Sequence, residues 1–464
     1  MTTEPKTQRK PLSETGLVTM LVLLGLLCAT ESLAQFSNKD EYVINGYHEP
    51  AVANPIARLE QAMQTGGVTL PYQDNGRGKL DALLAVLNID PASQLLVYSP
   101  TSLQHKLISP EKPRALFFNN NTYIGFVQNS EIVEVTSIDD DKGMVFYTFD
   151  NVPEGSKGFE RSDQTCLVCH DTQGTMGGGV PMLMALSSVY SKRNVPLKNY
   201  SGIGNIVDQS PLAGRWGGWY VTGRHGLQPH LGNIFLDDAS QLENLDDFRI
   251  WNLKTLRDTG YMDPEPYPAD TSDIVALMVL EHQVTIQNQI TYVKFKAPAV
   301  LKRRGIASVE DIDTWVALPK EARRALQRML DNLVALLVFM DAADLQSRIS
   351  GTPAYTEAFL SRGVMDSQGR SLRELDLGKR LFCYPLSYLV YTDDFNSLQP
   401  YALDYVLQQL AAYLSGDITL PGRSQFTDAE RQAALEILTE TLPAFRPYMT
   451  ARTTAATGNM ASAW

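Results

Sequence analysis

The chain has few of the residues that build disulfide frameworks: it contains four cysteines in 464 residues, together with six histidines. Cys28 lies in an apolar N-terminal segment, and Cys166 and Cys169 form a close pair. If the N-terminal segment is removed and the pair is used elsewhere, Cys383 is left alone and no intramolecular disulfide framework is possible. A protein of this length must then depend on its hydrophobic core for stability, and the chain is long enough to form one.

Long hydrophobic runs are also scarce. The longest, Gly16–Ala29, is shorter than the stretch of about 20 apolar residues that a membrane-spanning helix needs. Lys6, Arg9 and Lys10 precede this run, and Ser32-Leu33-Ala34 follows it as a small-x-small cleavage site. This three-part pattern predicts a secretory signal peptide over 1–34 and an exported, periplasmic protein without an integral membrane segment after cleavage.

Two alternatives to cleavage remain open for this segment. An uncleaved signal would leave an N-terminal membrane anchor. A lipoprotein would be attached through Cys28, although Leu27 stands before it where a small residue is expected.

The chain has fewer basic than acidic residues: 40 Lys and Arg against 52 Asp and Glu give a net charge of −12. This balance argues against nucleic acid and anionic membrane surfaces as partners, and it permits docking to a basic redox partner protein. The chain also lacks the G-x-S-x-G, H-E-x-x-H and phosphate-binding-loop motifs that mark common hydrolases and nucleotide-binding proteins.

The most informative string is Cys166-Leu167-Val168-Cys169-His170, which has the C-x-x-C-H spacing of a c-type haem attachment site. In such a site the two thiols form thioethers with the haem vinyl groups. The histidine that follows binds the iron as its proximal ligand. The motif therefore predicts one covalent haem c held by Cys166, Cys169 and His170.

Two other interpretations of the same residues are weaker. A zinc site would need a fourth ligand, and the chain has no second C-x-x-C to supply a structural site. A thioredoxin-like dithiol would sit at a helix N-terminus within a βαβ unit, and the surrounding pattern is not of that kind.

Through these five residues and the signal peptide, the chain resembles c-type cytochromes. A second resemblance, to a group of uncharacterised exported bacterial monohaem proteins, is carried by Arg215–Gly223 (RWGGWYVTG), His225 and His230–Asn233 (HLGN). That group implies no function beyond haem binding. The order of a sheet before the haem motif is similar to that of the cytochrome c′-β group, and it differs from the small all-helical cytochromes c.

The sixth iron ligand is not fixed by the motif. His225 and His230 are the first candidates, because they lie in a loop with tryptophans that could wall a haem pocket. Met182 and Met184 are the second candidates, because both are within reach of the motif along the chain. An open sixth position is the third possibility.

The pattern along the chain predicts an α+β fold. Short runs rich in β-branched and aromatic residues between 95 and 149, separated by turn clusters, predict an antiparallel β meander. A haem-binding irregular segment and a mainly helical C-terminal half follow. Helices are expected from Ser272 or Asp273 to Gln289, from Pro319 to about Asp344, over Pro400–Leu414 and after a Thr427–Glu430 capping box. The expected divisions are a signal peptide (1–34), a helical lead-in (35–95), the meander with the haem region (96–270), a helical domain (271–447) and a disordered tail (448–464).

Two functions are consistent with these features. A single covalent haem in an exported acidic protein favours electron transfer. The size of the chain, which exceeds what electron transfer needs, favours a haem enzyme or small-gas sensor with an open or displaceable sixth site, peroxidase-like or nitric oxide-binding.

Overall fold

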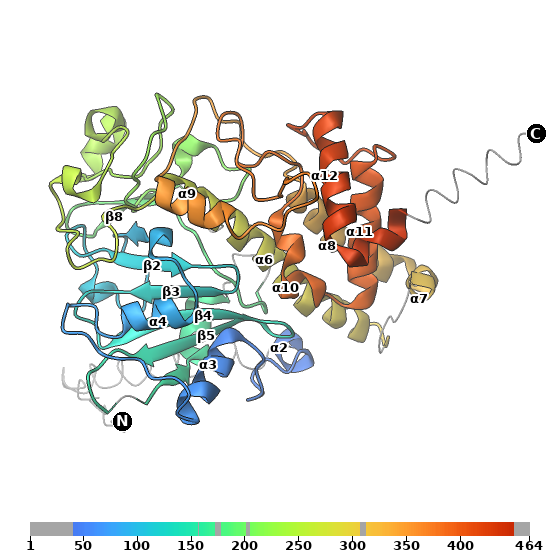
Figure 1. The fold of residues 1–464 in the computed structure, drawn as a ribbon, viewed down its shortest axis with the longest axis horizontal. Coiled ribbons are helices and arrows are strands. Elements are labelled where there is room, and N and C mark those ends of the chain that lie inside the picture. The colour runs from blue at the N-terminus through green and yellow to red at the C-terminus, as the bar shows by residue number, and fades with distance from the viewer. Residues whose placement is uncertain (1–39, 156, 172–177, 201–204, 307–311, 450–464) are drawn as a thin grey trace, which may run out of the picture.

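The structure, a computed structural model, describes residues 40–449 except 156, 172–177, 201–204 and 307–311. The expected signal peptide and the tail beyond residue 449 lie outside the described residues. The fold is α+β, as the sequence predicts: an antiparallel sheet lies in the N-terminal half and the C-terminal half is mainly helical (Figure 1).

The sheet has six strands in sequence order, each antiparallel to its neighbour, so the predicted meander is confirmed. The strands are β1 (Leu95–Val97), β2 (Arg114–Phe118), β3 (Thr122–Phe126), β4 (Ile132–Asp139), β5 (Gly143–Asp150) and β6 (Phe159–Arg161). In the central pair, Glu134 of β4 lies opposite Thr148 of β5, and Thr136 lies opposite Phe146. A separate hairpin is formed by β7 (Ser188–Tyr190) and β8 (Pro196–Asn199).

Alternation along the strands gives the sheet two different buried faces. Val145, Tyr147 and Phe149 of β5 belong to one apolar cluster, which also includes residues of α3 (Pro55–Gln64) and α4 (Leu80–Val86). Met144 and Phe146 of the same strand point the other way, into a cluster shared with later parts of the chain. The candidate site lies on this second face.

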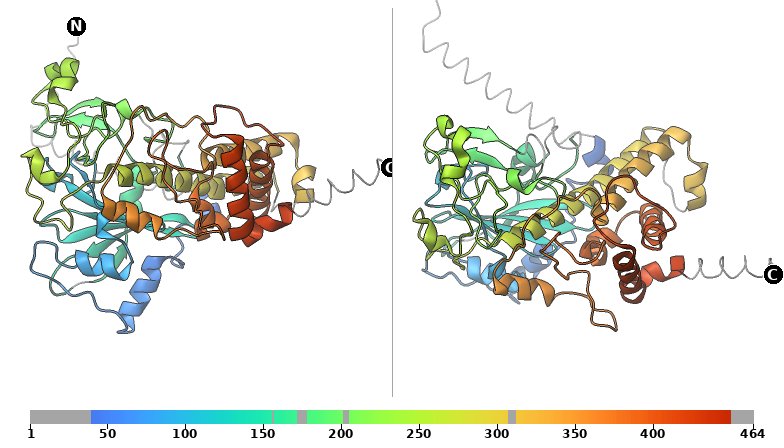
Figure 2. Two further views of the ribbon diagram at one scale, coloured as in Figure 1. Left: turned by 45° about the horizontal axis from the view of Figure 1, so that its top comes forward. Right: turned by 90° about the horizontal axis from the view of Figure 1, so that it is seen from above.

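The long helix α6 (Ile274–Lys302) links the sheet to the helical half (Figure 2). Its 29 residues correspond to a length of about 43 Å. The predicted start is confirmed, because the Asp273 carboxylate accepts hydrogen bonds from the amides of Val275 and Ala276. The helix runs past the predicted end at Gln289 and through Pro298. Proline cannot donate to the carbonyl of Lys294, and the Gln399 side chain donates to that carbonyl instead.

The following helices complete the description of the C-terminal half. They are α7 (Ile312–Ala317), α8 (Lys320–Leu337), α9 (Pro353–Leu360), α10 (Asp393–Asn396), α11 (Pro400–Leu414) and α12 (Asp428–Thr441), with α2 (Asp40–Ile44) near the chain start. The predicted bounds of α11 and the Thr427–Glu430 capping box are confirmed. Helix α8 ends at Leu337, earlier than predicted, because Phe339 and Asp341 adopt positive φ values of 58°. Within the described ranges, none of the helices is both long and apolar enough to span a bilayer.

Candidate functional site

The C-x-x-C-H motif lies on the short helix α5 (Asp163–His170), which follows β6 directly. The Ser162 amide before the helix donates to the carbonyl of Phe146, so the helix start is tied to β5. The Cys166 amide then donates to the Ser162 carbonyl at 3.0 Å. The sheet therefore fixes the position of α5, which the sequence pattern places in an irregular segment.

Helix geometry brings the three motif side chains to one face. At about 100° per residue, Cys166, Cys169 and His170 lie within a sector of about 100°. Leu167 points into the core and is 1% exposed, whereas Cys169 lies at the surface and Cys166 and His170 are half-buried. The two thiols and the imidazole are thus presented together along the edge of the core.

The imidazole of His170 is held by its own hydrogen bond and by packing. Its Nδ1 lies 2.7 Å from the carbonyl oxygen of Met182, an acceptor, so Nδ1 carries the proton and donates. The Met182 amide donates in return to the His170 carbonyl at 3.0 Å. The ring packs on Phe146 with 4.6 Å between centroids. Burial lowers the pKa of His170, which keeps the imidazole neutral and leaves Nε2 as an unprotonated nitrogen ligand.

A charged pair on the same face of the sheet acts on the motif. Arg114 of β2 and Glu134 of β4 form an ion pair at 2.7 Å, and Ser102 donates to the other Glu134 oxygen at 2.7 Å. Burial has the larger effect on the pKa of both Cys166 and His170; beside it, the Glu134 charge shifts both pKa values upward and the Arg114 charge shifts that of His170 downward. The sequence offered no signal for this pair, since it is assembled by the sheet register.

The Cys166 thiol lacks the lowered pKa of an activated cysteine. Burial raises the pKa of Cys166 to about 12, the opposite of the shift that a nucleophilic or metal-binding thiolate needs. Among the residues that the structure describes, no three His, Cys, Asp or Glu side chains converge as a metal cluster. The raised pKa of the Cys166 thiol argues against the dithiol interpretation.

The methionine candidates for the sixth ligand lie close to His170 in the chain. Met182, however, contacts the Nδ1 side of the imidazole and not the Nε2 side that would bind iron. The Met182 carbonyl is on the Nδ1 side of the imidazole, opposite to Nε2, and its side chain is packed in the core at 2% exposure. Met184 is half-buried two residues further on. Met182 therefore orients the ring through its backbone.

The histidine candidates lie along a different part of α6. His230 packs on Trp216, whose indole donates to Glu281 in the first third of that helix. Phe146, on which His170 packs, shares an apolar cluster with Tyr292 and Phe295, which lie about 16 Å or more further along α6 than Glu281. The rings of His225 and His230 lie 4.4 Å apart between centroids. The structure therefore brings neither histidine to the motif.

The two histidines also differ in how their ring nitrogens are used. In His225, Nδ1 pairs with the Gln228 carbonyl and Nε2 accepts from the Asn252 amide. In His230, Nδ1 accepts from the Gly232 amide, and Nε2 is buried without a hydrogen-bond partner. Burial lowers the pKa of both, so both are held neutral.

The structure assembles a further polar array that the sequence did not indicate. His282 bonds through Nδ1 to Asp208 and through Nε2 to Ser387, each at 2.7 Å. This is the order of a Ser-His-Asp triad, but Ser387 and His282 are both 0% exposed. The Ser387 oxygen also accepts the Leu389 amide at the start of a short helical turn. We assign the array to the support of the core, because no substrate can reach a fully buried hydroxyl.

Comparison of the chain with protein-family models, curated proteins and solved structures finds no match.

Proposed function

We propose that the protein is an exported monohaem c-type cytochrome. Cys166 and Cys169 would carry the two thioether bonds of one haem c, and His170 would be the proximal iron ligand. The observation that supports this most directly is the imidazole of His170, whose Nδ1–H is committed to a backbone carbonyl and whose Nε2 is left as a ligand. The donor set fits the group, because both thiols share the helix face of that imidazole.

The role that we propose is electron transfer to or from a redox partner protein. When bound, haem supplies a one-electron couple whose potential depends on the axial ligands and on the charges around it. Phe146 and Met182 would hold the imidazole ring in one orientation. The Arg114–Glu134 pair would add a fixed dipole near the iron ligand.

The second candidate, a haem enzyme or small-gas sensor with an open sixth position, is favoured by the placement of the distal candidates. His225 and His230 lie along another part of α6, and the Met182 carbonyl lies on the Nδ1 side of the proximal ring. Nearby polar atoms also suit a reactive pocket, since Nε of Arg114 and Oε1 of Gln104 are buried without hydrogen-bond partners. These groups could bond to a small molecule on the iron.

Carbon monoxide separates the two roles. Electron transfer with a sixth protein ligand predicts a low-spin spectrum in both oxidation states, and the reduced spectrum should not change under carbon monoxide. An open site predicts a high-spin ferric spectrum and rapid carbon monoxide binding to the reduced protein. Arg114→Gln, compared with the exposed control Arg324→Gln, should change the carbon monoxide dissociation rate only in the open-site case.

A further inference from the structure

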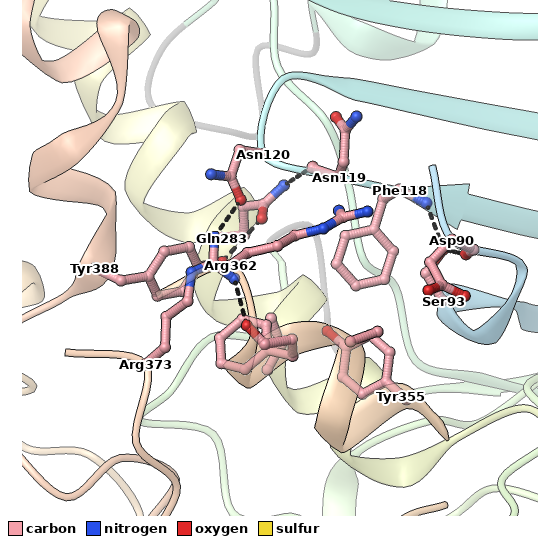
Figure 3. A pocket seen from close by; sticks show the side chains of 13 residues that line it. Asp90, Ser93, Phe118, Asn119, Asn120, Gln283, Tyr355, Arg362, Arg373 and Tyr388 are labelled. Carbon is pink, nitrogen blue, oxygen red and sulfur yellow. Dashed lines mark hydrogen bonds between the residues drawn. The ribbon is translucent and has the colours of Figure 1, made fainter. Parts of the chain in front are cut away.

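The hollow between the β2–β3 turn and α9 is too small for a ligand (Figure 3). Apart from open solvent it has room for about one water molecule. Arg362 extends across it, and the guanidinium of Arg373 lies over the Tyr388 ring at 4.1 Å from the centroid. Arg373 also donates to the side-chain oxygen of Asn120 at 2.7 Å. The protein's own side chains therefore fill this hollow.

A projecting side chain on another part of the surface has no such partner. Leu227 is the most exposed large apolar residue in the part of the chain that the structure describes, at 87%. It stands in the turn formed by residues 224–228, next to His225, which is only 3% exposed. Trp251, 40% exposed, stacks on the His225 imidazole with 5.6 Å between centroids. An exposed leucine and a half-exposed tryptophan thus belong to one small surface.

Buried polar groups hold this turn in one conformation. The side-chain oxygen of Asn252 accepts the amides of His225 and Gly226 at 2.8 and 3.0 Å, and its nitrogen donates to the Gly226 carbonyl at 3.1 Å. The His225 imidazole donates from Nδ1 to the Gln228 carbonyl at 2.7 Å and accepts the Asn252 amide at Nε2. Gly226 has a φ of 64°, and a Cβ there would meet the Ser347 side chain at 2.7 Å.

The other side of the turn is fixed to residues 346–350. The Gln228 side chain donates to the Ser347 carbonyl at 2.8 Å and accepts the Gln346 amide at 2.9 Å. Leu227 itself belongs to none of the apolar clusters of the described chain. A single exposed leucine is common on protein surfaces. A leucine presented by a turn that buried side chains fix on both sides is a different feature, because ordering the turn costs conformational entropy.

The surface around Leu227 is positive within an acidic chain. Residues 224–228, 249–254 and 346–350 include no acidic residue and four basic ones: Arg224, Arg249, Lys254 and Arg348. Arg249 is neutralised by Asp246, with 2.6 Å between the charged groups. The other three are exposed, and within the described ranges they form no ion pair. Three unpaired cations around an apolar side chain are complementary to an acidic surface.

We propose that residues 224–228 and Trp251 form a docking surface for a protein partner that has an apolar pocket with an acidic rim. Leu227 would enter the pocket, Trp251 would pack at its edge, and the three unpaired cations would face the carboxylates of the rim. Because the turn is already fixed, little conformational entropy is lost on binding. The proposal goes beyond the haem function and does not depend on it.

A lipid surface is the other class of partner for a leucine beside a tryptophan. Even a covalent myristoyl chain gives only marginal membrane binding, and Leu227 with part of the Trp251 ring offers less apolar surface than that. A bilayer also has no shaped pocket, so the fixed conformation of the turn would bring no advantage there. These two points favour a protein partner.

Site-specific photo-crosslinking in the producing cells finds the partner. The full-length, haem-loaded protein carries the photoreactive residue at position 227 or, as a control, at position 316 on α7, where Val316 is 62% exposed. We expect a protein with an acidic surface to be crosslinked from position 227 only. The absence of such a product, or crosslinking only to a second copy of this chain, would overturn the proposal.

Binding of the purified partner then decides the matter. Leu227→Ser should weaken binding at least about tenfold, because burial of the leucine is lost, and Val316→Ser should not change it. Asn252→Ala keeps Leu227 but frees the turn, and it too should weaken binding, with urea unfolding used to show that the fold is intact. Arg348→Gln should slow association and reduce its dependence on salt.

Three results would refute the proposal. The first is equal affinity of Leu227→Ser and the unchanged protein for the partner. The second is binding that does not depend on salt. The third is binding of the protein to phosphatidylglycerol vesicles that is lost in Leu227→Ser, since this would assign the surface to a membrane.

Discussion

A comparison of Phe146 with Phe149 tests whether the ring of Phe146 orients the imidazole of His170 or only fills the core. Both residues lie on β5, both are phenylalanine, and both are buried, at 3% and 0% exposure. Phe146 packs on the His170 imidazole, whereas Phe149 faces the α3 and α4 side of the sheet. Substitution of each by leucine gives a matched pair that differs only in the face of the sheet that is altered.

The expected magnitudes follow from the contacts. Each variant should lose about 1–2 kcal/mol of unfolding free energy, as is common for a core substitution that removes part of a side chain. Each variant also loses a ring contact with 4.6 Å between centroids, worth about 0.5–1.5 kcal/mol beyond burial: with His170 in Phe146→Leu and with Phe159 in Phe149→Leu. The hydrogen bond to the Met182 carbonyl, worth about 1 kcal/mol, would remain as the main restraint on the imidazole.

Since about 1.4 kcal/mol is a tenfold change in population, rotated imidazole orientations should become roughly twofold to tenfold more populated in Phe146→Leu. Electron paramagnetic resonance of the ferric protein should then show broadened or shifted g values in this variant only, while urea unfolding shows similar losses in both. The reasoning is refuted if Phe149→Leu perturbs the ferric spectrum equally, or if Phe146→Leu leaves it unchanged.

Cys169→Ser should retain one thioether at Cys166 and move the reduced α-band to longer wavelength; an unchanged band would contradict the assignment. Because burial lowers the pKa of His225 and His230, the unfolded chain binds protons that the folded chain does not. The free energy of unfolding should therefore be highest above about pH 6.5 and decrease below it, by up to about 1.4 kcal/mol per pH unit for His230. Urea unfolding at pH 7 and pH 5 measures this decrease. His230→Gln should reduce that dependence. Ser387→Ala should cost about 1–3 kcal/mol of stability, and a fluorophosphonate probe should not label the native protein at Ser387.

The elements that the sequence predicted well are those whose signals are local. The strands between 95 and 150 are bounded by turn clusters, and α12 begins at a capping box that can be recognised from four residues. β6 was missed because three residues, Phe159–Arg161, are too few for a pattern. The end of α8 was placed too late because the positive φ at Phe339 is imposed by tertiary packing on a residue that seldom adopts it.

The site divides in the same way. The motif is contiguous, so its C-x-x-C-H spacing could be recognised from the residues alone, but its position on helix α5 was not predicted. The Arg114–Glu134 pair depends on strand register, and the contact of Arg373 with Asn120 joins residues 253 positions apart. The candidates His225 and His230 were chosen because aromatic residues surround them in sequence, and the structure shows that these aromatics pack along another part of α6.

The central claim is that haem is bound covalently through Cys166 and Cys169. A pyridine haemochrome spectrum of the mature protein, recorded after denaturation and acid–acetone extraction, tests it directly. The account predicts that haem stays with the polypeptide and that the α-band lies at the position of a haem with both vinyl groups saturated. Haem that is extracted into acetone, or protein that contains none, would contradict it.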